Sequence, residues 1–108
     1  MKYLIDADIA SYYLRGKDDL LNTFGTKGFR NIKMSITTAA ELEVLAYKNP
    51  ESKINLATVY RLSIKLGIIN IDRGTWTLFS QMKATTLSTG KPRGDFDILL
   101  ASIAIQNS

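Results

Sequence analysis

Six of the ten acidic residues of this 108-residue chain fall into three close pairs. The pairs are Asp6 with Asp8, Glu41 with Glu43, and Asp95 with Asp97. Two carboxylates ~4 Å apart repel each other by about 4 kcal/mol at an effective dielectric constant of 20, so protons or a divalent cation must neutralise a cluster of them. An all-oxygen set of ligands suits Mg²⁺ or Mn²⁺. Such a cation activates water for the hydrolysis of a phosphodiester.

Helix capping is a local alternative explanation for each pair. Asp6 follows an apolar run and could cap the next helix, since Asp is a preferred N-cap residue. Thr38 and Glu41 have the spacing of a capping box. Asp95 could be an N-cap, with Asp97 in the first turn. These alternatives stay open for each pair alone, but the three pairs together favour a shared site.

The pattern of apolar residues predicts strands that alternate with helices, which is typical of an α/β fold with a parallel sheet. Strands are expected over residues 3–5, 32–36 and 68–71. Helices are expected over residues 9–15, 18–24, 37–48, 52–66, 74–87 and 95–106. In such a sheet the carboxyl ends of the strands collect the ligand site, and the first two acidic pairs follow predicted strands.

Composition excludes several classes of chemistry. The chain contains no cysteine and no histidine, which excludes disulfides, thiolate nucleophiles, Ser-His-Asp triads and histidine-bound metals. No run of about 18 apolar residues is present, so no membrane span is expected. The amino terminus leads directly into the first strand without a signal peptide. We therefore expect one cytoplasmic domain over residues 1–108.

Positive charge predicts a polyanionic partner. The chain has 14 basic and 10 acidic residues, a net charge of +4, and six of those acids lie in the three pairs. The loop of residues 88–94 is rich in Gly, Pro and basic residues, and it contains Lys91 and Arg93 beside the third acidic pair. We expect both side chains to bind RNA phosphates, although a solvated turn is the alternative.

Three stretches together resemble the PIN-domain ribonucleases, in particular the VapC toxins of toxin–antitoxin pairs. The stretches are YLIDAD (3–8), MSITTAAEL (34–42) and GKPRGDFDILLA (90–101). The resemblance implies a three-layer α/β/α PIN-like sandwich with a small parallel sheet. It also implies a Mg²⁺- or Mn²⁺-dependent endoribonuclease that acts on RNA as the toxin of such a pair.

The resemblance implies that Asp6, Glu41 and Asp97 are the catalytic, metal-binding acids. Thr38 would support them with its hydroxyl. Asp8, whose position is usually Asn in relatives, and Asp95 would lie nearer the rim. The family has a further strand after the last helix, and this sequence lacks it, so weak metal binding and reduced activity are expected.

A VapB-like antitoxin and a homodimer are the partners that the resemblance implies. Two short helices near the amino terminus contain more apolar residues than a small sheet needs, which favours a dimer face or an antitoxin groove. These residues are Tyr12, Tyr13, Leu20, Leu21 and Phe24.

Two other functions compete with a toxin ribonuclease. Residues 4–8 also resemble the nucleophile strand of haloacid-dehalogenase-like phosphatases, in which Asp6 would be the nucleophile and Asp8 the acid/base. The second alternative is a catalytically impaired PIN-like module that binds RNA or an antitoxin. Phosphatase activity on a small phosphomonoester would favour the first alternative, and internal cleavage of RNA would exclude it.

Overall fold

A computed structural model describes residues 2–91 and 93–108 of the chain. The chain forms two compact units, Met1–Ile69 and Asn70–Ser108, and each is described by itself. Within its described residues the first unit contains β1 (Tyr3–Ile5), α1 (Ala7–Arg15), α2 (Leu20–Lys27), the single-turn 3-10 helix η1 (Phe29–Asn31), β2 (Ile32–Ser35), α3 (Ile36–Lys48), α4 (Leu56–Leu66) and β3 (Ile68–Ile69). The second unit contains α5 (Arg73–Ser88) and α6 (Asp95–Gln106).

The sheet of the first unit is parallel, in the order β1-β2-β3. Ile5 pairs with Met34, and Ser35 pairs with Ile69, so the carboxyl ends of the strands lie at one edge. This confirms the predicted α/β class with a parallel sheet. The three-layer arrangement and the single domain over residues 1–108 stay predictions.

Short polar residues and glycine set the ends of the helices in this unit. Asp6, Ser35 and Asn55 are the N-caps of α1, α3 and α4, and each side chain accepts a hydrogen bond from a backbone N–H in the first turn. Gly16 ends α1 with φ of 72°, a left-handed conformation that glycine adopts without a steric penalty. The predicted ends of α1 are therefore confirmed to within two residues.

An aromatic cluster lies in the core of the first unit. The Tyr13 and Phe24 rings stack with centroids 4.7 Å apart, and Phe29 meets both rings edge-on. Phe24 is buried, and Leu20 packs against the same core. Phe24 is therefore not available for the predicted partner face, because α2 turns it into the core. Tyr13 and Leu20 are half-buried against this core, while Tyr12 and Leu21 are exposed.

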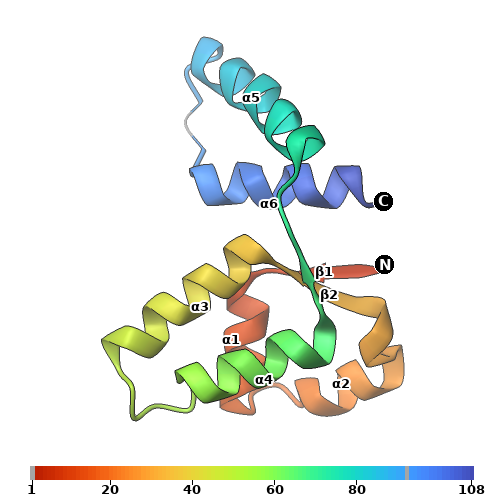
Figure 1. The fold of residues 1–108 in the computed structure, drawn as a ribbon, viewed down its shortest axis with the longest axis vertical. Helices are drawn as coiled ribbons and strands as arrows, with labels where there is room; N and C mark the ends of the chain where they lie inside the picture. Colours follow the sequence, from red (N-terminus) through yellow and green to blue (C-terminus); the bar gives the residue numbers. More distant parts are fainter. Residues whose placement is uncertain (1, 92) are drawn as a thin grey trace. The chain divides into compact units, whose positions relative to one another are not determined.

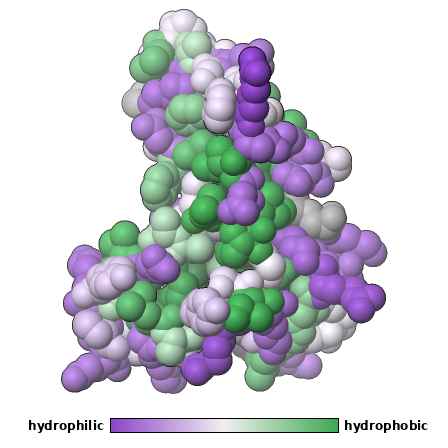
Figure 2. All heavy atoms as spheres, viewed as in Figure 1, coloured by the Kyte–Doolittle hydropathy of each residue, from purple (hydrophilic) through white to green (hydrophobic). Residues whose placement is uncertain are grey.

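Exposed apolar side chains lie instead on the helices that follow. Figure 1 shows α3 and α4 of the first unit, which pack against each other while α1 packs on α3. Leu56, Tyr60 and Ile64 recur every four residues along α4, and Tyr60 and Ile64 are each 66% exposed. Hydrophobic side chains are visible among hydrophilic ones on the face of this unit that Figure 2 presents.

The second unit is a pair of packed helices, α5 and α6. Asp72 is the N-cap of α5 and forms a capping box with Thr75. Gln106, at the end of α6, donates a hydrogen bond from Nε2 to Asp72 Oδ1 at 2.8 Å and also pairs with the Thr75 hydroxyl. The start of α5 is thereby joined to the end of α6.

Two details differ from the sequence-based expectation. β3 ends at Ile69, two residues earlier than predicted, so Asp72 does not follow the strand directly. Asp18 and Asp19 precede α2 instead of lying in its first turn, and both have positive φ. Across the described part of the chain, none of the helices has both the length and the apolar character that crossing a membrane requires.

Candidate functional site

Asp6 lies directly after β1, at the carboxyl edge of the sheet. Its Oδ1 accepts a hydrogen bond from Ile9 N at 2.8 Å, so the predicted capping role is confirmed. The side chain is exposed, and a carboxylate has about four acceptor sites, so one hydrogen bond leaves room for a cation. Capping and metal binding are therefore compatible at Asp6.

The start of α3 is built from buried hydroxyls, and the predicted capping box of Thr38 and Glu41 is wrong. Ser35 is the N-cap, and its Oγ accepts from Thr38 N at 3.1 Å. Thr38 is 1% exposed, and its hydroxyl donates to Ile5 O at 3.4 Å. Thr38 thus ties the first turn of α3 to the residue that precedes Asp6.

Glu41 lies one turn after Thr38 on α3 and is half-buried. Residues three apart share a helix face, so Glu41 lies on the Thr38 side of α3. Glu43 is exposed and is offset from that face. Asp8 is exposed in the first turn of α1. The first unit therefore holds two of the three predicted catalytic acids, Asp6 and Glu41, on elements joined through Thr38.

The third acidic pair lies in the second unit, at the start of α6. Gly94 is the N-cap, so the predicted capping role of Asp95 is wrong; both Asp95 and Asp97 lie in the first turn. Asp95 Oδ1 forms an ion pair with Lys83 Nζ of α5 at 2.8 Å. Asp97 is exposed and lines a cavity between α5 and α6. Asp95 therefore links the start of α6 to α5 through a solvent-exposed ion pair, while Asp97 faces the cavity.

A complete metal site over Asp6, Glu41 and Asp97 stays a prediction, because these acids belong to different units. Taken separately, neither unit brings three or more acidic side chains together as metal ligands among its described residues. The donors are nevertheless of the type that Mg²⁺ and Mn²⁺ prefer, since carboxylate and hydroxyl oxygens make up the whole set.

The cavity of the second unit has a volume of about 330 Å³. Its lining includes Arg93, one of the two predicted RNA-binding residues. Lys91 is exposed in the loop after α5, and its backbone N–H donates to Thr86 O at 3.3 Å. Pro92, between the two basic residues, lies outside the described part of the chain. Both cationic side chains therefore reach solvent close in sequence to Asp97.

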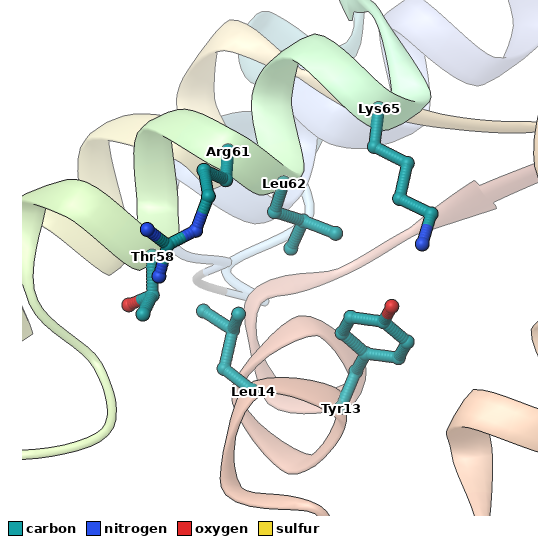
Figure 3. A pocket seen from close by; sticks show the side chains of 6 residues that line it. All are labelled: Tyr13, Leu14, Thr58, Arg61, Leu62 and Lys65. Atoms are coloured by element: carbon teal, nitrogen blue, oxygen red, sulfur yellow. The ribbon is translucent and has the colours of Figure 1, made fainter.

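A second cavity, of about 310 Å³, lies between α1 and α4 in the first unit. Figure 3 shows Leu14 and Leu62 pointing toward each other across it, with Arg61 on one side and Lys65 on the other. The Lys65 ammonium lies 4.0 Å from the centre of the Phe29 ring. This cationic, apolar cavity was not predicted from the sequence. Its one signal in the sequence was Arg61, a charged residue at helical spacing between the apolar residues Ala57 and Ile64.

Hydrogen bonds within the second unit lower the pKa of the Asp72 carboxyl below its ordinary value. The backbone N–H of Thr75 is the main cause that lowers the pKa of this carboxyl, followed by the Gln106 side chain. Both donate hydrogen bonds to Oδ1, and hydrogen bonding favours the charged form. The ionised Asp72 carboxylate therefore links the start of α5 to the end of α6.

Comparison with known proteins shows the fold. No protein-family model matches the chain, and no curated protein matches it either. Solved structures match over nearly the whole chain. In the VapBC2 complex of Rickettsia felis bound to a DNA fragment from its promoter, the similar chain is 23% identical, with a TM-score of 0.84 over 100% of this chain and 84% of that one.

Two further complexes contain similar chains. DNA-bound VapBC of Salmonella typhimurium gives 22% identity and a TM-score of 0.84, covering 96% of this chain and 79% of that one. VapBC-1 of nontypeable Haemophilus influenzae gives 20% identity and a TM-score of 0.79, covering 97% of this chain and 80% of that one. The chain thus has the fold of a chain found in VapBC complexes. The resemblance inferred from the three motifs is confirmed at the level of the fold.

Proposed function

We propose that this chain is a VapC-like toxin, a metal-dependent endoribonuclease of the PIN-domain class. The observation that supports this most is the arrangement of Asp6 and Glu41. Asp6 directly follows β1 at the carboxyl edge of a parallel sheet, and Glu41 lies one turn after Thr38 on α3. The buried Thr38 hydroxyl joins these two segments. A VapBC complex contains two kinds of chain, and the three acidic motifs favour the VapC kind for this one.

In this proposal Asp6, Glu41 and Asp97 hold Mg²⁺ or Mn²⁺, which when bound lowers the pKa of a water and neutralises phosphate charge. Thr38 is a positioning residue, because its hydroxyl fixes the backbone next to Asp6. Asp8 is exposed in the first turn of α1 and orients water at the rim of the site. Asp95 positions Asp97 through its ion pair with Lys83. Lys91 and Arg93 both contact RNA beside the scissile bond, Lys91 through a phosphate.

The test is cleavage of single-stranded RNA by the purified chain, with Mg²⁺ or Mn²⁺ and with EDTA. Asp6→Asn, Glu41→Gln and Asp97→Asn should each reduce cleavage by about 100-fold or more, since each removes a ligand worth several kcal/mol in the transition state. Asp6→Asn is especially informative, because asparagine caps a helix as well as aspartate does.

Glu43→Gln is the matched control, because it makes the same change on an exposed position of α3. It should cleave at the wild-type rate. Cleavage that persists in EDTA, or in all three acidic variants, would contradict the proposal. Hydrolysis of a small phosphomonoester without cleavage of RNA would favour the phosphatase alternative instead.

We also propose a VapB-like antitoxin as the protein partner, bound at the cavity between α1 and α4. Its floor is apolar, through Leu14 and Leu62, and two cations flank it. An amphipathic segment that carries a carboxylate beside an apolar side chain complements both features. Homodimerisation is part of the same proposal, and the apolar line on α4 (Leu56, Tyr60 and Ile64) is exposed as such an interface requires.

A further inference from the structure

The cavity between α5 and α6 lies beside Asp97, and its lining combines an apolar floor with a polar rim. Six residues line it: Met82, Thr86, Arg93, Asp97, Ile98 and Ala101. All of them belong to the second unit. Its volume of about 330 Å³ is at the small end of the range for ligand sites, which suits a group the size of one nucleotide.

The floor of this cavity is held in place by a buried hydroxyl. Ser102 is fully buried, and its Oγ lies 2.8 Å from Ile98 O and 3.6 Å from Met82 Sδ. Next to Met82, Lys83 forms an ion pair with Asp95 in the first turn of α6. The positions of the thioether and of Ile98 are therefore set before any ligand binds, which lowers the entropic cost of binding.

The chemistry of the lining favours a flat ligand with hydrogen-bond acceptors on its edge. A thioether and aliphatic side chains pack well against an aromatic face. The Arg93 guanidinium is exposed at the rim and offers paired donors in one plane. Asp97, also at the rim, disfavours a free phosphate at this point, because the two negative charges would repel each other.

We propose that this cavity binds the guanine base of the nucleotide next to the scissile phosphate. Arg93 donates two hydrogen bonds to guanine O6 and N7, the geometry in which arginine recognises guanine. The base lies against Met82, Ile98 and Ala101, and Thr86 contacts its edge. This assignment rests on the proposed ribonuclease function, in which Asp97 is a catalytic acid, and it adds a preference for sequence.

We expect the RNA to be single-stranded at this position, because a paired and stacked base would first have to leave the duplex at a cost in free energy. The probes are therefore two short unstructured RNAs, U3GU3 and U3AU3, and the measurement is their affinity for the purified chain in EDTA. Without a divalent cation the metal site makes no contribution, and recognition of the base is measured alone. The wild-type chain should bind U3GU3 about tenfold more tightly, which is the discrimination of one good bidentate pair.

Arg93→Lys keeps the charge but cannot form the paired hydrogen bonds, so it should abolish the preference for guanine while it retains most of the affinity for U3AU3. Ala101→Leu fills the cavity and should weaken binding of U3GU3 selectively. Lys91→Ala is the matched control, and it should weaken both RNAs equally. Circular dichroism verifies that each variant is folded.

Equal binding of the two RNAs by the wild-type chain, or an unchanged preference in Arg93→Lys, would overturn the proposal. So would an Ala101→Leu variant that loses a protein partner and binds both RNAs normally, since the cavity would then be a protein site. Failure of the ribonuclease proposal is distinguishable. A chain that binds U3GU3 preferentially but never cleaves RNA keeps the guanine site and loses the catalytic one.

Discussion

Asp72 shows how one side chain can join two helices. A single oxygen, Oδ1, accepts from Thr75 N at 3.0 Å, from the Thr75 hydroxyl at 3.1 Å and from Gln106 Nε2 at 2.8 Å. All three hydrogen bonds stabilise the ionised carboxylate, and they therefore hold the pKa of Asp72 below its ordinary value. The same oxygen thus serves as a helix cap and as the link between α5 and α6.

This lowered pKa predicts how stability changes with pH. Because the folded-state pKa is below the unfolded-state pKa, the contribution of Asp72 is fully present above the unfolded-state value and is lost as pH falls through the folded-state value. Asp72→Asn should therefore lower the melting temperature at pH 7, and the difference from wild type should close in acid. Thermal unfolding followed from pH 7 to pH 2 measures this.

Asp19→Asn is the control, because Asp19 is an N-cap whose side chain makes no capping hydrogen bond. Its melting temperature should follow the wild type at every pH. A constant gap between wild type and Asp72→Asn down to pH 2 would show that the charge of Asp72 contributes nothing to stability.

At the scale of elements, α2 has one buried face and one exposed face. Phe24 is 4% exposed and stacks on Tyr13, whereas Leu21 is 63% exposed. The sequence alone does not distinguish these two apolar residues as core and surface. The packing of α2 on α1 and η1 makes the distinction.

Truncation of the two side chains tests this assignment. Phe24→Ala should lower the free energy of unfolding by about 3–5 kcal/mol, since it leaves a cavity in the aromatic cluster. Leu21→Ala should change it by less than about 0.5 kcal/mol. Chemical denaturation of both variants gives the comparison. Equal losses would mean that Leu21 is covered, as it would be in a dimer that uses α2.

At the scale of the whole molecule, the positions of the positive charges distinguish an RNA partner from a protein partner. The net charge of +4 favours RNA, while Arg61 and Lys65 place part of that charge beside an apolar cavity in the first unit. An exposed lysine elsewhere attracts a polyanion equally well. A cation beside an apolar floor also selects a partner with apolar side chains, and that requirement distinguishes an antitoxin segment from nucleic acid.

Charge reversal at the cavity tests the antitoxin proposal. Arg61→Glu should weaken binding of a VapB-type antitoxin about tenfold or more, because like charges at an interface cost several kcal/mol. Lys48→Glu makes the same change in charge on α3, at an exposed position away from the cavity lining, and should have little effect. Isothermal titration calorimetry gives both affinities. Equal weakening by the two variants would indicate general electrostatics and no specific groove.

The sequence by itself determined the features that depend on neighbouring residues. Periodicity and capping preferences are local, so the predicted bounds of α6, Asp95–Gln106, agree with the structure, as do those of β1. The position of Asp6 after a strand follows from the same local rules. The identity of the acids as candidates for metal binding was equally accessible, since it depends on residue type and spacing.

Tertiary structure decided everything that depends on residues far apart in the chain. Tyr13 and Leu14 line one cavity with Arg61 and Lys65 only because α1 and α4 both pack on α3, and this cavity has no counterpart in either segment alone. Ser35 replaced Thr38 as the cap of α3 because pairing in the sheet ends β2 at that residue. Side-chain packing over long sequence separations leaves no periodic signal, so these features could be found only in the folded chain.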